Sequence, residues 1–336
     1  MDSAIDGCPT PQLSIVTTLY NTAAFVREFH RRMSATAKRL TERYEIIFVN
    51  DGSLDDSLAL ALGLRKEDSK VKVVDLSRNF GQHKAMVTGL AHARGELVFQ
   101  IDSDLEEEPE LLVRFHEELS RSAADVVYAT QTKRQGSLCK RLSGAAFYTL
   151  VRFLSSYPVP SNPLNARLMT RRYVDSLLLH REREVYMAGL WAITGYRQVA
   201  IPALKHSRGD SSYTLARKLS LMVNAITAFS NRPLYFVFWI GLAIMTLAAG
   251  SGLALFLLRL FWCDYLTGWT SLILSVWLLG GGNIFCMGIM SIYLSKVFLE
   301  VKQRPYSIVR HLYDGAAIDG ETATVRRDIR ERVDAA

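Results

Sequence analysis

Short apolar runs alternate with amphipathic stretches along the first 130 residues. Apolar, β-branched runs at 13–20, 45–51, 71–77, 97–104 and 124–130 predict five strands. Residues 23–40, 57–67 and 78–93 place apolar side chains at helical spacing, and a further helix is predicted to begin at Glu107–Glu110, where acidic residues suit a first turn. This alternation predicts an α/β domain with a mostly parallel sheet covered by helices on both faces.

Two later stretches, 233–258 and 265–295, contain no Asp, Glu, Lys, Arg or His. Crossing a bilayer takes a helix of about 20 apolar residues. We therefore predict two transmembrane helices, at about 234–258 and 269–294, joined by a short loop into a hairpin. Lys and Arg flank its outer ends, so the positive-inside rule predicts an integral protein of the bacterial inner membrane with the preceding domain and both termini in the cytoplasm.

The same pattern predicts the order of domains. We expect an N-terminal tail (1–12), a cytoplasmic catalytic domain (13–231), the transmembrane hairpin (232–296) and a cytoplasmic C-terminal segment (297–336). Within the catalytic domain, 136–157 and 214–231 combine apolar residues at helical spacing with basic residues on the rim. This pattern is typical of amphipathic helices that lie at a membrane surface.

Composition narrows the function less than the pattern does. The net charge of +7 could indicate a nucleic-acid partner, but basic residues beside a membrane anchor are more simply explained by anionic lipid headgroups, so no nucleic acid is expected. The four cysteines lack the spacing of a metal site or a disulfide framework. A glycine-rich dinucleotide fingerprint does not follow the first strand, which disfavours a dinucleotide-binding fold.

Four successive predicted strands end in, or run directly into, polar side chains: Tyr20 and Asn21, then Asp51, then Arg78, then Asp102. Since parallel strands end at the same edge of a sheet, where ligands of α/β proteins bind, we expect a polar cleft there. Asp102 and Asp104 are spaced i, i+2 after a buried strand. They could lie in a solvated turn, but a divalent cation between them is the favoured interpretation, and oxygen-only ligands suit Mg²⁺ or Mn²⁺.

Four segments, in this order, resemble the family 2 glycosyltransferases, which have the GT-A fold: YN, EIIFVNDGSLDDS, LSRNFGQHKAMVTGLAHARGE and IDSDLEEEPELL. The segments RLMTRR and KHSRGDSSYT, together with the predicted hairpin, narrow the resemblance to polyisoprenyl-phosphate glycosyltransferases, relatives of dolichol-phosphate mannose synthase. The resemblance spans roughly residues 13 to 312.

This resemblance implies the inverting transfer of one sugar from a nucleotide-diphosphate sugar, a UDP-sugar by family habit, to a polyprenyl phosphate such as undecaprenyl or dolichyl phosphate. It implies a Mg²⁺ or Mn²⁺ cofactor held by Asp102, Asp104 and Glu106, with Glu106 where relatives have Gln. The residues it assigns to the nucleotide are Tyr20, Asn21, Asp51, Ser53, Arg78, Lys84 and Asp102, although Arg78 and Lys84 could equally be solvated charges.

The catalytic residues implied are Asp102, Asp104 and Asn165, the last at the place of an Asp that is sometimes assigned as a base. Asn165 can orient but cannot take a proton. A phosphate monoester with its second pKa near 6 can attack without a base. Cationic and hydroxyl side chains are expected around the acceptor phosphate: Arg134, Arg141, Arg167, Lys205, Arg208 and Ser212.

Other functions remain open from the sequence. The same fold could glycosylate another membrane acceptor, or the chain could be a non-catalytic membrane scaffold that binds nucleotide sugars. The hairpin carries small residues in LLGGGN, which favour close helix packing, and we expect the chain to form homo-oligomers in the bilayer.

Overall fold

The computed structural model describes residues 10–131, 163–204, 232–261 and 268–314. These residues form two compact units. The sheet domain comprises the described residues up to 204 together with 305–314, and the helical unit comprises the described residues from 232 to 304. Both amphipathic segments predicted at the membrane surface, 136–157 and 214–231, lie outside the described residues.

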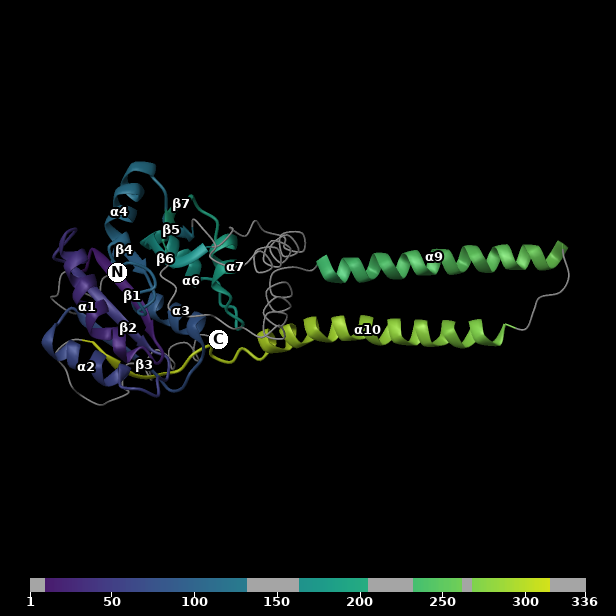
Figure 1. Cartoon of the computed structure of the whole chain (residues 1–336), viewed down its shortest axis with the longest axis horizontal. Coiled ribbons are helices and arrows are strands. Elements are labelled where there is room, and N and C mark those ends of the chain that lie inside the picture. Colours follow the sequence, from purple (N-terminus) through teal and green to yellow (C-terminus); the bar gives the residue numbers. More distant parts are fainter. Residues whose placement is uncertain (1–9, 132–162, 205–231, 262–267, 315–336) are drawn as a thin grey trace, which may run out of the picture. The chain divides into compact units, whose positions relative to one another are not determined.

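A mixed sheet forms the centre of the sheet domain (Figure 1). Its strands, among the described residues, are β1 (Leu13–Leu19), β2 (Tyr44–Asn50), β3 (Val71–Leu76), β4 (Leu97–Gln100), β5 (Val126–Gln131), β6 (Pro163–Thr170), β7 (Gln198–Ala203) and β8 (Val309–Tyr313). Their order across the sheet is β7-β5-β6-β4-β1-β2-β3-β8. Strands β1 to β4 are mutually parallel, whereas β6 runs antiparallel to β4 and β8 runs antiparallel to β3.

Helices cover both faces of this sheet. One face packs against α1 (Ala23–Lys38), α2 (Ser57–Glu67) and α4 (Leu111–Ser122), and the other against α3 (Gln82–His92), α6 (Arg171–Leu178) and α7 (Met187–Ile193). Every residue of β1 and β2 is buried, which explains why these strands are nearly continuous apolar runs rather than alternating ones. The predicted α/β architecture with a mostly parallel sheet is confirmed.

The packing of α3 onto the sheet depends on Gly89. A Cβ atom added at this glycine would lie 2.5 Å from Cγ1 of Val16 and 2.7 Å from Cγ2 of Val49. These distances are far below van der Waals contact, so only a glycine lets α3 approach β1 and β2 this closely. The close approach fixes the N-terminus of α3 above the carboxyl ends of the central strands.

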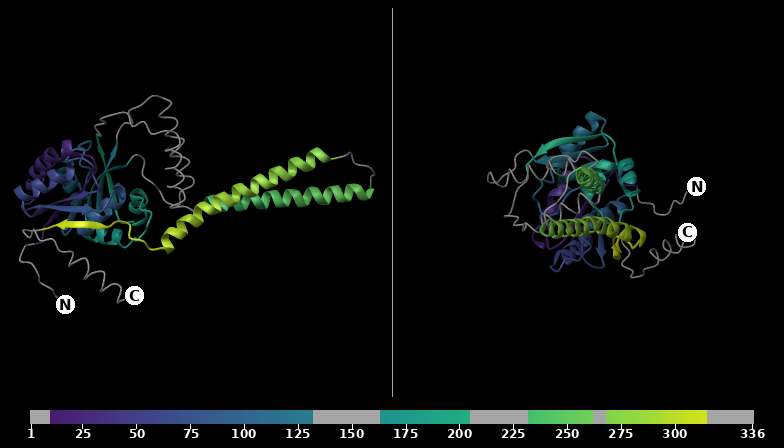
Figure 2. Two further views of the ribbon diagram at one scale, coloured as in Figure 1. Left: turned by 90° about the horizontal axis from the view of Figure 1, so that it is seen from below. Right: turned by 90° about the vertical axis from the view of Figure 1, so that its right-hand side faces the viewer.

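Several elements were not predicted. Strands β6 and β7 and helices α6 and α7 extend the sheet domain beyond its fifth strand. The C-terminal segment, expected as a separate region from residue 297, instead contributes β8, which pairs with β3 at the edge of the sheet (Figure 2). The sheet domain is therefore built from residues on both sides of the predicted hairpin in the sequence.

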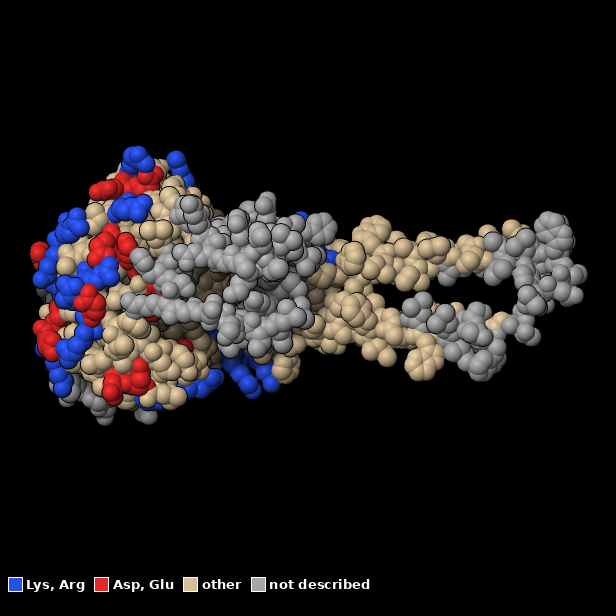
Figure 3. All heavy atoms as spheres, viewed as in Figure 1, with Lys and Arg blue, Asp and Glu red and all other residues tan. Residues whose placement is uncertain are grey.

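The helical unit contains α9 (Arg232–Phe261) and α10 (Trp269–Val301), which contact each other. Among the described residues, Ser275–Val301 is the stretch long and apolar enough to cross a membrane, and a shorter apolar segment runs from Arg232 to Ile244. Large apolar side chains on both helices are exposed, such as Leu247 at 73% and Trp277 at 78%. In Figure 3 the described parts of these helices are almost free of charged atoms, whereas charged atoms are spread over the sheet domain.

Candidate functional site

Asp51 lies directly after β2 and ties two loops together. Its carboxylate oxygens accept hydrogen bonds from the backbone N–H groups of Phe80, at 2.7 Å, and Gly81, at 3.0 Å. Burial raises the pKa of Asp51, although these two hydrogen bonds work in the opposite direction. Each carboxylate oxygen keeps a second lone pair for a further donor. The loops after β2 and β3 are thus held to each other through Asp51, one of the residues predicted to bind the nucleotide.

Tyr20, Asn21 and Ser53 lie beside Asp51 at the ends of β1 and β2. The amide oxygen of Asn21 accepts a hydrogen bond from the backbone of Leu54 at 2.9 Å, and the Ser53 hydroxyl donates to the Leu19 carbonyl at 3.2 Å. Asn21 has a φ of 54°, a left-handed conformation that asparagine tolerates better than most residues. The Tyr20 side chain is about half exposed. The structure therefore brings four of the predicted nucleotide residues together at one edge of the sheet.

Arg78 and Lys84 lie on the loop after β3 and on the first turn of α3. The Arg78 guanidinium stacks over the Phe80 ring at 4.2 Å and donates to the Asn79 carbonyl at 3.0 Å. The Lys84 ammonium lies 3.9 Å from a carboxylate oxygen of Glu184. Both cations are on the expected side of the sheet.

Asp102 follows β4, and its carboxylate is hydrogen-bonded to two amide side chains. Its Oδ1 accepts a hydrogen bond from Nε2 of Gln82 at 2.8 Å, and its Oδ2 accepts one from Nδ2 of Asn165 at 2.7 Å. Gln82 begins α3 and Asn165 lies on β6, so the carboxylate is fixed from two elements. Asp104, two residues on, accepts a hydrogen bond from the Glu106 backbone at 3.0 Å. The three predicted catalytic residues lie on two neighbouring segments: Asp102 and Asp104 follow β4, and Asn165 lies on β6, which pairs with β4.

Glu107 has a different role from the one expected. It is 2% exposed, and its two carboxylate oxygens accept hydrogen bonds from the backbone N–H groups of Asn165, at 2.9 Å, and Ala166, at 2.6 Å. Helix α4 begins only at Leu111. The prediction that Glu107 belongs to a helix first turn is therefore wrong. The carboxylate holds β6 in place, and with it the Asn165 side chain that contacts Asp102.

Arg167, two residues after Asn165 on β6, is completely buried. Its guanidinium carbon lies 3.1 Å from the centre of the Trp191 ring, and its Nε and Nη1 atoms have no hydrogen-bond partner among the described residues. Burial lowers the pKa of Arg167 to about 9, so the side chain stays charged near neutral pH. Gln100 Oε1 and Trp191 Nε1 are also buried without a hydrogen bond in the described part of the chain. Buried polar groups in this state indicate a place where a polar ligand can bind.

The sequence alone missed several of these residues. Gln82, Gln100, Glu107 and Trp191 have no motif that marks them, because their roles depend on where β6 and α7 pack. The remaining predicted acceptor residues lie outside the described residues: Arg134, Arg141, Lys205, Arg208 and Ser212.

Comparison with known proteins identifies the family. The family model described as glycosyl transferase family 2 matches residues 14–175. A Mycobacterium tuberculosis protein whose name places it among the glycosyltransferases is 46% identical over 315 residues, which cover 94% of this chain and 92% of that protein. The chain belongs to glycosyl transferase family 2.

Two further matches extend over most of this family 2 glycosyltransferase. The Escherichia coli protein named prophage bactoprenol glucosyl transferase homolog is 28% identical over 305 residues, covering 90% of this chain and 99% of that protein. Among solved structures, the Pyrobaculum calidifontis mannosyltransferase PcManGT in complex with GDP-Man and Mn²⁺ is similar with a TM-score of 0.45 and 17% identity. That match covers 90% of this chain and 89% of the other.

The carboxylates of the family 2 glycosyltransferase suit a divalent cation. Asp102 and Asp104 offer oxygen ligands only, the donor set that Mg²⁺ and Mn²⁺ prefer. The described residues contain no group of three or more His, Cys, Asp or Glu side chains that could hold a metal. Two carboxylates leave the other coordination positions to water and to the oxygens of a diphosphate, which is the usual arrangement for Mg²⁺. The oxygen-only donor set is compatible with such a metal, which Asp102 and Asp104 would hold, and Glu106 remains the third predicted ligand.

Proposed function

We propose that this protein transfers one sugar, with inversion, from a nucleotide-diphosphate sugar to a polyprenyl phosphate at the cytoplasmic face of the membrane. A UDP-sugar is the proposed donor. The relative named as a bactoprenol glucosyl transferase homolog supports a polyprenyl acceptor, since bactoprenol is a polyprenol. Membership of family 2 supports the transferase chemistry.

One observation carries the proposal: the carboxylate of Asp102 is fixed between two amide donors directly beside the loop that Asp51 organises. A site that must hold a diphosphate needs its anionic ligand in one fixed orientation, because reorganisation during the reaction raises the barrier. Nucleotide contacts from Asp51 and diphosphate contacts from Asp102 and Asp104 would then follow in the order in which the donor carries those groups.

The leaving group of the reaction is a nucleoside diphosphate, whose negative charge grows as the glycosidic bond breaks. A divalent cation bound there supplies Lewis-acid stabilisation of that charge. From the chain itself, Asp102 and Asp104 provide the anionic ligands. The cations of Arg78 and Lys84 lie on neighbouring segments and can contact the same phosphates.

The proposed nucleophile is the acceptor phosphate, which is mostly dianionic near neutral pH and attacks the anomeric carbon without losing a proton. Asn165 supports this mechanism because its Nδ2 group donates to Asp102 at 2.7 Å. An aspartate at this position would face the Asp102 carboxylate and repel it. Asn165 therefore acts by orienting Asp102, and Arg167, buried two residues further along β6, is the proposed contact for the acceptor phosphate.

A polyprenyl phosphate lies in the bilayer, so the enzyme must reach the membrane surface. The apolar stretch Ser275–Val301 in α10 supports one membrane span, and the sequence pattern of 234–258 in α9 supports a second. We propose that α9 and α10 form a transmembrane hairpin with the sheet domain and both termini in the cytoplasm.

The test is transfer of radiolabelled sugar to purified polyprenyl phosphate by the full-length protein in detergent. A panel of UDP- and GDP-sugars is supplied with Mn²⁺, with Mg²⁺, or with EDTA, and the labelled lipid is extracted. We expect label in the lipid with one donor, loss of label with EDTA, and a fall of about 10²- to 10³-fold for Asp104→Asn. Asp56→Asn, which removes an exposed carboxylate at the start of α2, is the matched control and keeps wild-type transfer.

The outcomes separate the rival functions. Transfer to a lipid-linked diphosphate or a diacylglycerol, but not to polyprenyl phosphate, would assign a different membrane acceptor. Binding of a nucleotide sugar with no transfer to any lipid would indicate a non-catalytic scaffold. Equal activity of Asp104→Asn and Asp56→Asn would contradict the assigned site.

A further inference from the structure

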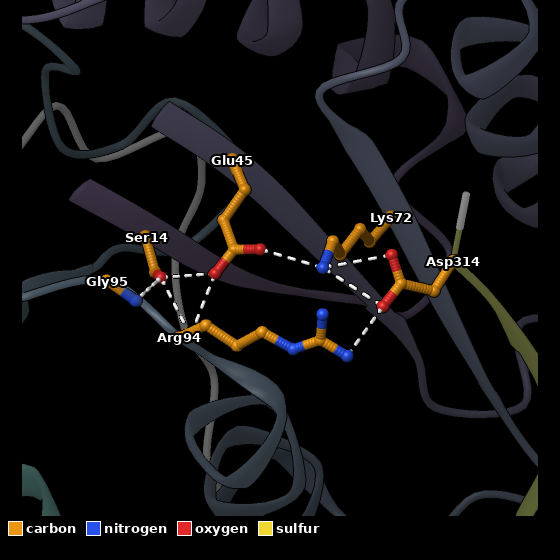
Figure 4. A network of polar contacts seen from close by, with 6 residues as sticks. All are labelled: Ser14, Glu45, Lys72, Arg94, Gly95 and Asp314. Carbon is orange, nitrogen blue, oxygen red and sulfur yellow. Dashed lines mark hydrogen bonds and ion pairs between the residues drawn. The ribbon is translucent and has the colours of Figure 1, made fainter. Parts of the chain in front are cut away.

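Strand β8 follows α10 in the chain and is anchored at its C-terminal end by a partly buried ion-pair network (Figure 4). Asp314, just after β8, contacts the Lys72 ammonium at 2.9 Å and the Arg94 guanidinium at 3.2 Å. Lys72 also pairs with Glu45 at 3.0 Å, and Glu45 accepts a hydrogen bond from the Ser14 hydroxyl. Ser14, Glu45 and Lys72 lie at the beginnings of β1, β2 and β3, so this network sits at the opposite end of the strands from the proposed donor site.

The other end of β8 lies against the last residues of β3. The Ser77 backbone N–H donates to the Ile308 carbonyl at 2.9 Å, and the Arg310 guanidinium donates to the Ser77 carbonyl at 2.5 Å. Arg310 also lies 3.7 Å from a carboxylate oxygen of Asp75. The strand after the helical unit therefore reaches the point where β3 ends and the loop containing Arg78 begins.

A continuous line of polar contacts runs from Arg310 into the proposed donor site. The second carboxylate oxygen of Asp75 accepts a hydrogen bond from Nδ2 of Asn50 at 2.8 Å, and Oδ1 of Asn50 accepts one from the Ser53 backbone at 3.2 Å. Both Asp75 and Asn50 are only 2% exposed. Because Asp75 is an acceptor only, it allows just one orientation of the Asn50 amide, the one that turns Oδ1 toward Ser53.

The loop that Asn50 holds has little freedom elsewhere. Gly52, with a φ of 66°, packs so closely on the next loop that a Cβ atom would lie 2.5 Å from the Asn79 nitrogen. Asp51, on the same loop as Gly52, accepts hydrogen bonds from the backbone of Phe80 and Gly81 on the loop after β3. A change in the Asn50 amide would therefore move Asp51 and Ser53 together, and these are two of the proposed nucleotide residues.

We propose that Asp75 is a positioning residue for donor binding: gripped by Asn50 of β2 and by Arg310 of β8, it sets the shape of the nucleotide-binding loop. The strand that returns from the helical unit is thereby part of the support for the donor site. This inference rests on the proposed function, because it takes the edge formed by Asp51 and Ser53 as the nucleotide-binding edge. It adds residues that contact no substrate and act through Asn50.

The experiment measures donor binding and kinetics separately with full-length protein. UDP and GDP are titrated calorimetrically in the presence of Mn²⁺, and donor KM and kcat are measured with saturating polyprenyl phosphate. For Asp75→Asn, whose new amide can donate to Asn50 and release its orientation, we expect the nucleotide Kd and donor KM to rise about tenfold with kcat nearly unchanged. For Arg310→Gln, at the exposed end of the line, we expect a rise of about three- to fivefold, and Arg310→Lys restores part of it.

The matched control is Arg94→Gln, which removes the contact between a cation on the loop after α3 and Asp314, at the other end of β8. We expect it to leave the donor Kd and KM at the wild-type values even if it lowers the melting temperature. If Arg310→Gln and Arg94→Gln change Kd and melting temperature alike, β8 supports only the fold and the inference fails. Arg310→Gln, on the surface, keeps the test decisive even if Asp75→Asn does not fold.

The same data distinguish this inference from the proposed function. A wild-type protein that binds UDP or GDP but transfers no sugar to lipid contradicts the proposed function alone. A wild-type enzyme that transfers sugar, with Asp75→Asn and Arg310→Gln binding nucleotide at wild-type affinity, contradicts this inference alone. A wild-type protein that binds neither nucleotide contradicts both.

Discussion

Arg167 is a fully buried cation in the candidate site, and burial lowers its pKa to about 9. Its fully buried guanidinium has two nitrogen atoms without a hydrogen bond to the part of the chain that the structure describes, so its lost hydration is not fully compensated there. The stacking on Trp191, with the guanidinium carbon 3.1 Å from the ring centre, offsets only part of this cost, since a buried cation–π contact contributes about 2 kcal/mol. A residue that costs stability and stays charged is better explained by ligand binding than by folding.

This argument predicts opposite effects on stability and activity. The variant Arg167→Met keeps a similar side-chain volume and removes the buried charge. Its free energy of unfolding should equal that of the wild type or exceed it by up to about 2 kcal/mol, and its melting temperature should be unchanged or higher. Sugar transfer should fall by about 10²-fold, with the loss appearing in the acceptor KM. Thermal unfolding and initial rates against polyprenyl phosphate check both. A variant that is both less stable and fully active would show that the guanidinium serves the fold.

His83 provides a prediction about pH. Its Nδ1–H group donates to the Val185 carbonyl at 3.3 Å, and its ring packs edge-to-face on Tyr186. Burial lowers the pKa of His83 below its usual value of 6.5. As the pH falls below about 6.5, the unfolded chain binds a proton that the folded chain resists, so this histidine lowers the stability of the fold on the acid side and not above pH 7.

His83→Asn keeps a donor near the Nδ1 position but cannot titrate. The difference in melting temperature between wild type and His83→Asn should therefore shift in favour of the variant when the pH is lowered from about 8 to about 5.5. Thermal unfolding at both pH values measures this shift. Because other groups titrate equally in both proteins, a difference that is constant with pH would rule out the effect.

At the scale of elements, the position of β6 decides whether the site is assembled. Glu107, from the loop after β4, accepts two backbone hydrogen bonds from β6, and Asn165 then contacts Asp102. In Glu107→Gln one acceptor becomes an N–H₂ group that faces a backbone N–H, which leaves two buried donors in conflict. We expect the free energy of unfolding to fall by about 1–3 kcal/mol and kcat to fall by up to about tenfold.

The control is Glu108→Gln at the neighbouring position. Glu108 is less buried than Glu107, and the substitution makes the same change of charge and size. Unfolding by urea gives the stability, and transfer under saturating donor and acceptor gives kcat. If the two variants behave alike, the loss of one negative charge explains the effect, and the two hydrogen bonds from the β6 backbone to Glu107 do not.

Among the strands, those most readily predicted from the sequence are the ones with both faces buried. β1 and β2 are predictable because helices cover both sides and most of their residues are apolar. Strand β6 is not, since Asn165 and Arg167 face the site and interrupt its apolar pattern. For the same reason Asp51 and Asp102 could be identified from their positions after strands, while Glu107 and Gln82 act only through contacts with segments distant in the sequence.

For the whole molecule, the main feature that the sequence did not indicate is the return of the chain to the sheet. β8 is a short strand of mixed composition, Val309–Tyr313, and it lies at a half-exposed edge. Its partner β3 lies more than 200 residues earlier, so no local pattern links the two. The apolar stretches between them predicted a membrane hairpin at the end of a finished domain. In the sequence, the helical unit instead lies between two segments of the sheet domain.

This insertion predicts how the sheet domain behaves without the helical unit. A chain that ends at residue 231 lacks β8 and exposes the edge of β3, an open strand edge that promotes aggregation. A chain in which residues 232–304 are replaced by a long Gly/Ser linker keeps β8, including the contacts of Arg310 with Ser77 and of Asp314 with Lys72. Both variants retain the same residues up to 231, and they differ in the linker and in residues 305–336, which contain β8.

We expect the linker variant to unfold at a temperature at least about 5 °C above that of the chain ending at 231, since loss of a paired strand removes several backbone and charged hydrogen bonds. The linker variant should also remain in the supernatant after ultracentrifugation. Equal melting temperatures and equal solubility would mean that the sheet is complete without β8, and that the chain returns to it without contributing to its stability.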